Sequence, residues 1–356
     1  MVDKFINQEK LKRRGSIIVL SLWTLLFLSI LALFSGFITH QEILLAKKVE
    51  IRNKSYELVY AGALILLDVV TNLFKKQVTG VKVDSWGDFW ANNPNLFKEI
   101  KLEEGVVSVY HNHWDNFKRQ RVRWYGLDDE ESKININYVS KDVLQRLFSL
   151  VVGKDKECSK LVGAIIDWRD KDDFLSNSKS KLSERVDYIN SGYTYTPKNA
   201  PFKSIEELLL VKGMTEEIFM KIKDYITVFG SGRVNINTAS REVLLSVGLM
   251  NSLVEKIIRF RCGGDMIEGN ENDNVFSSLS TVISQLLLYY DISNYEKNRL
   301  QKAIDSGILG VSSTTFSAIC VGKLEKGQGG AKVRCIFDKN GKVKYWSCKY
   351  ISPQNN

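Results

Sequence analysis

The chain has 356 residues, of which 44% are hydrophobic and 26% are charged, and it carries a formal net charge of +9. These values exclude a disordered tail and allow two or three domains with buried cores. Basic residues are interspersed with acidic ones, so we interpret the excess charge as solvated surface rather than as a nucleic-acid site.

The first element is an apolar run over residues 16–38 without charged residues, histidine or proline. A bilayer core needs about 20 apolar helical residues, so the run predicts a transmembrane helix. No small-residue cleavage site follows it, so we expect the run to stay on the chain. Basic residues precede the run and predict that the amino terminus stays in the cytoplasm while the rest of the chain is exported. These residues are Lys4, Lys10, Lys12, Arg13 and Arg14.

The junction Arg14-Gly15-Ser16 before this run resembles the cleavage site of type IV prepilins and pseudopilins. Their leader is cut on the carboxyl side of the glycine, and the apolar helix remains on the mature protein. The resemblance implies removal of residues 1–15, with Ser16 as the new amino terminus.

Apolar residues then recur at spacings of three, four and seven as far as Phe74, which predicts one face of an amphipathic helix. No proline occurs before Pro94, so both helical segments can form one rod from about Ser16, on the order of 85 Å long. Such a rod fits either an anchor packed on a soluble domain or a subunit that bundles into a filament.

Strand patterns flank a central helical block. Residues 101–110 and 117–125 are rich in valine and aromatic residues, and three alternating segments follow residue 315, with a hairpin signal at Asn340-Gly341. A helical block inserted into an α+β domain explains this order. The predicted parts are a leader (1–15), a transmembrane segment (16–38), a first domain part (39–139), the insertion (140–305) and carboxy-terminal strands (306–356).

The insertion contains an internal repeat, because residues 134–144 return in register as residues 234–244. Each copy predicts an extended piece, a cap at Asn137 or Asn237, and a helix. Glycine turns at Gly213 and Gly248 predict helix-hairpin-helix units, which often bind nucleic-acid phosphates. A membrane-anchored DNA-binding protein of a pilus or competence system is therefore the alternative prediction. Because both units lack the usual second glycine, this alternative is the weaker one, and we expect no nucleic-acid partner.

An acidic loop inside the insertion is the candidate metal site. Crowded carboxylates repel one another unless a cation joins them, and oxygen donors select calcium rather than zinc. A solvated acidic turn, with Asp170 paired to a nearby lysine or arginine, explains the spacing equally well. The candidate ligands are Asp167, Asp170, Asp172, Asp173 and Glu184.

The remaining signals predict less chemistry. The five cysteines form no C-x-x-C pair, although Cys320, Cys335 and Cys348 are close enough in sequence for one disulfide in an exported chain. His111 and His113 have no metal spacing, and we expect them at the surface. Asp265 to Asp273 predicts a flexible surface loop. The motifs of hydrolases, nucleotide-binding proteins and zinc proteases are absent from the sequence, so we expect no enzyme.

An ordered series of segments resembles the minor pseudopilin K of type II secretion systems, also called general secretion pathway protein K. The resemblance covers nearly the whole chain. The segments that carry it are residues 125–130 (YGLDDE), 133–137 (KININ), 167–170 (DWRD), 199–204 (NAPFKS), 211–214 (VKGM) and 234–239 (VNINTA).

The resemblance implies a pilin-like α+β domain with a large α-helical insertion, in the bacterial inner membrane with a periplasmic carboxy-terminal part. It implies cleavage and methylation by the prepilin peptidase at Gly15 and Ser16, and calcium binding in the insertion. It also implies a tip position, where the protein helps initiate the pseudopilus that exports folded proteins. The implied partners are minor pseudopilins I, J and H, major pseudopilin G and the inner-membrane assembly platform.

One position in the apolar run supports the tip position. Most pilin-like subunits carry glutamate at the fifth mature residue, where it neutralises the amino terminus of the adjacent subunit. Here that residue is Leu20, and the first acid that follows is Glu42. We therefore expect no such pairing with a subunit ahead of this one.

Overall fold

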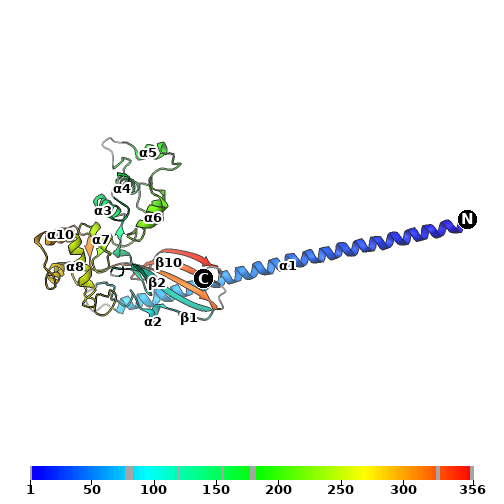
Figure 1. Ribbon diagram of the computed structural model, residues 1–356, viewed down its shortest axis with the longest axis horizontal. Coiled ribbons are helices and arrows are strands. Elements are labelled where there is room, and N and C mark those ends of the chain that lie inside the picture. Colours follow the sequence, from blue (N-terminus) through cyan, green and yellow to red (C-terminus); the bar gives the residue numbers. More distant parts are fainter. Residues whose placement is uncertain are drawn as a thin grey trace.

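A long helix projects from an antiparallel sheet, and a helical block lies at the far end of the sheet (Figure 1). The predicted α+β fold, pilin-like with a helical insertion, is confirmed. The computed structural model describes residues 2–76, 83–116, 118, 120–153, 156–176, 182–325 and 329–352, with side chains from residue 17 onward.

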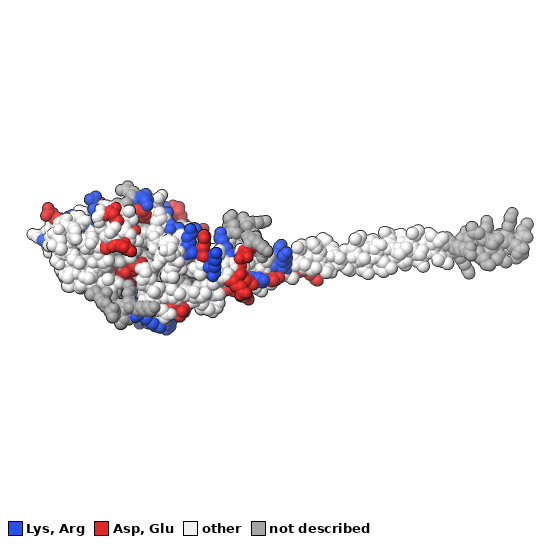
Figure 2. Space-filling view, turned by 90° about the horizontal axis from the view of Figure 1, so that it is seen from below, with Lys and Arg blue, Asp and Glu red and all other residues white. Residues whose placement is uncertain are grey.

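Helix α1 runs unbroken from Val2 to Lys76, as the absence of proline predicts. Ile17–Lys75 contains a stretch apolar enough to cross a membrane, and none of that stretch is buried. Figure 2 shows this stretch as a rod without charged residues. Such an apolar surface needs lipid or another protein around it.

The carboxy-terminal half of α1 packs on the sheet through an apolar stripe that includes Val59, Ala63, Leu66 and Val70. The helix lies very close to the sheet at Gly62, where a Cβ atom would come within 2.7 Å of the Val107 methyl groups. Close packing, rather than helix propensity, therefore explains a glycine in this helix.

The sheet has the order β1-β2-β9-β10-β11, and all its strands pair antiparallel; β3 also pairs with β2, and β4 with β9. β2 and β9 are neighbours although the whole helical block separates them in sequence. The short helix α2 (Pro94–Phe97) precedes the sheet. The strands are β1 (Ile100–Leu102), β2 (Gly105–Asp115), β3 (Gln120–Trp124), β4 (Asp128–Asp129), β9 (Thr315–Leu324), β10 (Gly330–Asp338) and β11 (Val343–Ile351).

The helical block consists of two similar units, each closed by a pair of short parallel strands. The first unit contains β5 (Ile134–Asn135), α3 (Lys141–Val151), α4 (Lys156–Arg169), α5 (Glu184–Asn190), the 3₁₀ helix η2 (Ile205–Leu210), α6 (Glu216–Ile222) and β6 (Ile226–Thr227). The second contains β7 (Val234–Asn235), α7 (Arg241–Ser246), α8 (Asn251–Arg261), η3 (Leu279–Thr281), α9 (Val282–Leu287), α10 (Asn294–Asp305) and β8 (Leu309–Gly310). A 3₁₀ turn, η1 (Glu130–Ser132), leads into the block.

The second asparagine of each repeat holds a distant loop rather than a helix end. The Asn137 amide donates to the Phe202 carbonyl and accepts from the Phe202 N–H. Asn237 makes the same pair of bonds with Phe276. The cap prediction for both asparagines is therefore wrong. The N-cap positions are taken by serines three residues later, Ser140 and Ser240.

An arginine at the end of one helix completes each unit; Arg261 is buried and Arg169 is half-buried. Arg169 at the end of α4 donates to two carbonyls of the first repeat, and Arg261 at the end of α8 does the same in the second. The repeat therefore extends beyond the segment that is visible in the sequence. The accepting carbonyls belong to Ile136 and Val139, and to Ile236 and Ala239.

Candidate metal site and N-terminal helix

Three of the five predicted ligands meet where α4 ends and α5 begins. Asp167 and Asp170 lie three residues apart, so they share one side of the chain as α4 ends, and Glu184 is the first residue of α5. Each offers an oxygen atom, and the three oxygens lie within 4.8 Å of one another. Glu184 is completely buried.

Several oxygens of this acidic triad, Asp167, Asp170 and Glu184, lack a hydrogen-bond donor. Asp167 Oδ1 accepts from the Ser176 N–H at 2.8 Å. Among the described residues, Asp170 Oδ1 and both Glu184 carboxylate oxygens are buried without a partner. Buried polar atoms almost always have one, and unpaired carboxylate oxygens that converge suit a hard cation such as calcium.

The raised pKa values of two residues of the acidic triad also favour a bound cation. Burial and the neighbouring aspartates raise the pKa of Glu184 to about 8. Burial and the Asp172 and Asp167 carboxylates raise the pKa of Asp170 to about 6. Burial is the largest cause of both shifts, and the neighbouring carboxylates add to it; Arg169 opposes the rise at Asp170 only in part, and a divalent cation would supply the missing positive charge.

The structure does not bring Asp172 and Asp173 into this group, because both hydrogen-bond within the loop. Asp172 accepts from the Phe174 N–H at 2.9 Å. Asp173 accepts from the Ser183 hydroxyl at 2.7 Å and from the Arg185 N–H at 3.2 Å. They shape the approach to α5 instead of completing the triad.

The predicted counter-ion for Asp170 does not appear in the described part of the loop. No lysine or arginine of that part lies within 4 Å of its carboxylate. Residues 177–181 of this loop lie outside the described residues.

In the second unit, Arg261 matches Arg169 by its contacts, so Arg259 and Cys262 occupy the places of Asp167 and Asp170. An acidic triad at this position therefore belongs to the first unit alone.

The acidic segment of the second unit lies partly at the surface, as predicted, with Asp265 and Glu271 exposed, but it also contains a docking contact. Glu268 is buried, forms an ion pair with Arg261, and lies 3.3 Å from His113 Nε2 on strand β2. Burial raises the pKa of Glu268, but Arg261 and His113 outweigh it and lower that pKa to about 2. This contact fastens the insertion to the sheet.

The two histidines are also buried, contrary to the surface prediction. They occupy alternate positions of β2, so both face the same side of the sheet. His111 stacks on Trp86, and His113 stacks on Trp124 with ring centres 3.7 Å apart. Burial lowers the pKa of His111 to about 4, which keeps the ring neutral.

The predicted disulfide is absent from the structure, because Cys320, Cys335 and Cys348 are free thiols.

The positions predicted for processing lie in α1. Leu20 is 67% exposed on the projecting rod, and Glu42 remains the first acid after it. Gly15 and Ser16 lie in the helical backbone, within the stretch whose side chains are outside the described residues. The predicted cleavage between them stays a prediction.

A long amino-terminal helix packed on an antiparallel sheet is the fold of pilin-like subunits, and here a helical block is inserted between two strands of that sheet. Residues 126–231 match the sequence model of "Type II secretion system (T2SS), protein K". A chain of the crystal structure of the GspK-GspI-GspJ complex from enterotoxigenic Escherichia coli shares the fold, with a TM-score of 0.56 and 14% identity. The alignment covers 84% of this chain and 97% of that one.

No curated protein matches the sequence. The family match lies in the first unit of the insertion, and the fold likeness extends over most of the chain. The chain is therefore similar to type II secretion protein K over residues 126–231, and it shares its fold with a chain of the GspK-GspI-GspJ complex.

Proposed function

We propose that this chain is a minor pseudopilin of the type II secretion protein K family. In this proposal it occupies the tip of the type II secretion pseudopilus and helps initiate its assembly, so that folded proteins can be exported across the outer membrane. The observation that carries the tip position is Leu20. A hydrophobic side chain at the fifth mature position offers no carboxylate to the amino terminus of a subunit ahead, while the apolar rod can still pack beside subunits below.

In this proposal the apolar part of α1 anchors the chain in the bacterial inner membrane as a single span. The basic residues before it keep the amino terminus cytoplasmic, and the sheet and insertion lie in the periplasm. The prepilin peptidase then cuts after Gly15 and methylates Ser16, which frees the helix to leave the bilayer.

The proposed neighbours are the minor pseudopilins I and J, named in the related crystal structure. Pseudopilins H and G and the inner-membrane assembly platform complete the proposed set of partners. The carboxy-terminal half of α1 is engaged with the sheet, so the projecting half offers its apolar surface to them.

We further propose that Asp167, Asp170 and Glu184 bind calcium. The unpaired buried oxygens support this proposal, because a cation would satisfy them and remove the repulsion between the carboxylates. Binding would fix the end of α4 against the start of α5. Chelation should then lower the melting temperature of the full chain, and calcium should restore it.

Co-purification separates the proposed function from the DNA-binding alternative. The full chain in detergent should form a stable complex with pseudopilins I and J and should not retain duplex DNA. Binding to DNA that weakens steeply with salt, without the pseudopilin complex, would contradict the proposal. The turn at Gly248 argues against DNA contact, because its N–H already donates to the Leu245 carbonyl.

A further inference from the structure

A cleft of about 590 Å³ lies on the seam between the two units of the insertion. Its wall on one side comes from the segment around Ser140 and the first turns of α3, and on the other from α10 and the turn at Gly248. Residues 231–233, which connect the units, close one end. Neither unit alone forms this cleft.

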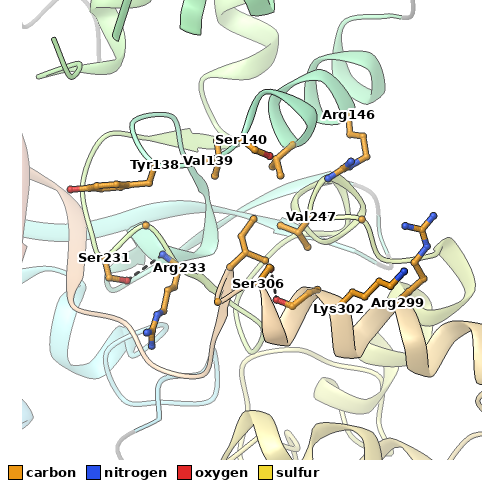
Figure 3. Close-up of a pocket in the computed structure, with 16 residues that line it drawn as sticks. Tyr138, Val139, Ser140, Arg146, Ser231, Arg233, Val247, Arg299, Lys302 and Ser306 are labelled. Carbon is orange, nitrogen blue, oxygen red and sulfur yellow. Dashed lines mark hydrogen bonds between the residues drawn. The ribbon is translucent and has the colours of Figure 1, made fainter. Parts of the chain in front are cut away.

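The charged residues that line the cleft are all basic. Arg146, Arg299 and Lys302 gather at one end, and Arg233 lies toward the other (Figure 3). No aspartate or glutamate lines the cleft, and within the described residues none of the four cations forms an ion pair within 4 Å. Four positive charges in a lining without acidic residues create a positive local potential.

The fold holds Arg146 in place. Arg146 Nε donates to the Ser246 carbonyl at 2.7 Å, which fixes the side chain across the seam. Burial lowers the pKa of Arg146, Asp142 on the same helix raises it, and Arg299 lowers it again, as expected for two neighbouring guanidinium groups. Helix α3 also begins at the cleft, so the positive end of its dipole adds to the potential.

The surface between the cations is apolar. Val139 and Val247 lie between Arg233 and the other three in Figure 3, and Val143 and Ala303 also line the cleft. A compact anion such as phosphate would reach only one end of this surface. A peptide with acidic side chains separated by apolar ones matches its alternation of charge and apolar surface.

We propose that this cleft binds an acidic segment of a partner protein, whose carboxylates pair with Arg146, Arg299 and Lys302 at one end and with Arg233 at the other. Inner-membrane headgroups do not fit this role, because the insertion lies at the end of the molecule opposite the amino terminus (Figure 1). Arginine suits carboxylates in particular, since its planar group donates two parallel hydrogen bonds. The proposal does not depend on the tip position or on calcium.

The test uses the full chain in detergent micelles and a rhodamine-labelled synthetic peptide of alternating glutamate and valine. A peptide with glutamine in place of glutamate is the matched probe. We expect the acidic peptide to bind and the glutamine peptide to fail, and we expect salt to weaken binding. Arg299→Gln combined with Lys302→Gln should reduce the affinity roughly tenfold.

The control variant Lys101→Gln with Lys323→Gln removes two exposed charges from the sheet and changes the net charge equally. Its affinity should stay within about twofold of the parent value. If both variants lost affinity for the acidic peptide equally, net charge alone would explain the effect, and the proposal would be overturned. It would also be overturned by failure of the acidic peptide to bind, by displacement by inorganic pyrophosphate at equal concentration, or by stronger binding of duplex DNA or anionic lipid vesicles to the same cleft.

Discussion

Glu184 is the residue whose environment conflicts most with its charge. Its two carboxylate oxygens are buried without donors and face two aspartates. Without a cation, the folded chain relieves the conflict by keeping the proton, which is why the pKa of Glu184 rises to about 8. The same residue thus connects a calcium proposal to a pH-dependent stability.

The sign of that dependence follows from proton binding. The pKa is about 8 in the folded chain and 4.5 ordinarily, so the folded state holds a proton that the unfolded state releases between these values. The melting temperature of the calcium-free chain should therefore fall as the pH rises from 5 to 8. Glu184→Gln cannot ionise and should reduce this fall, as measured by thermal unfolding followed by circular dichroism.

Calcium provides the second half of this prediction. At pH 8 it should raise the melting temperature of the parent chain and leave Glu184→Gln nearly unchanged. Glu157→Gln, at an exposed position on the same helix α4, is the matched control and should behave like the parent. A parent chain whose stability neither depends on pH in this range nor responds to calcium would rule out the cation site.

At the scale of elements, the packing of α1 on the sheet leaves no room at one position. A Cβ atom on Gly62 would meet the branched Val107 side chain at 2.7 Å. Gly62→Ala gains helix propensity but forces the helix away from β2. We expect a net loss of about 1–2 kcal/mol in the free energy of unfolding, measured by denaturant titration in micelles.

Two controls isolate the steric cause. A Cβ atom on Gly36 in the same helix has no neighbour within 4 Å, so Gly36→Ala should not reduce stability. Val107→Ala combined with Gly62→Ala should cost less than the sum of the single changes, because the clash is then absent. Additive costs would mean that the two residues do not compete for the same space.

The elements themselves follow from local patterns, whereas their contacts do not. The repeat predicts two units because its residues recur in register, and the crowding of carboxylates predicts a candidate cation site, of which the structure brings Asp167, Asp170 and Glu184 together. Asn137 reads as a cap because asparagine and serine both suit that place, and only the path of the distant Phe202 loop decides between them.

Burial by a distant segment explains the other departures. Alternation along β2 shows that His111 and His113 share a face, but the sequence does not reveal that Trp86 and Glu268 cover it. Likewise, Asp173 has the composition of a metal ligand, and only the backbone turn before α5 shows that both its oxygens are already used.

At the scale of the whole molecule, the insertion is fastened to the sheet by buried polar contacts. The Trp86 indole donates to the Thr238 carbonyl at 2.9 Å, and Asn235 donates to the Asp84 carbonyl at 3.0 Å. Together with the pairing of Glu268 and His113 of β2, these bonds hold the insertion at the end opposite the membrane helix (Figure 1). The seam cleft is therefore presented to the periplasm at a fixed place in our proposal.

The continuous rod of α1 gives the last prediction, because the charged leader and the apolar helix form one element. Moving the helix from the bilayer into a filament would carry the basic leader through the bilayer core, where each such charge costs about 3 kcal/mol. Cleavage after Gly15 removes that cost. Gly15→Val should block cleavage, so mass spectrometry should find the 15-residue leader still attached and the chain absent from complexes with pseudopilins I and J. Gly36→Ala, in the same helix, should be processed normally; an unchanged mature mass for Gly15→Val would refute the prepilin interpretation.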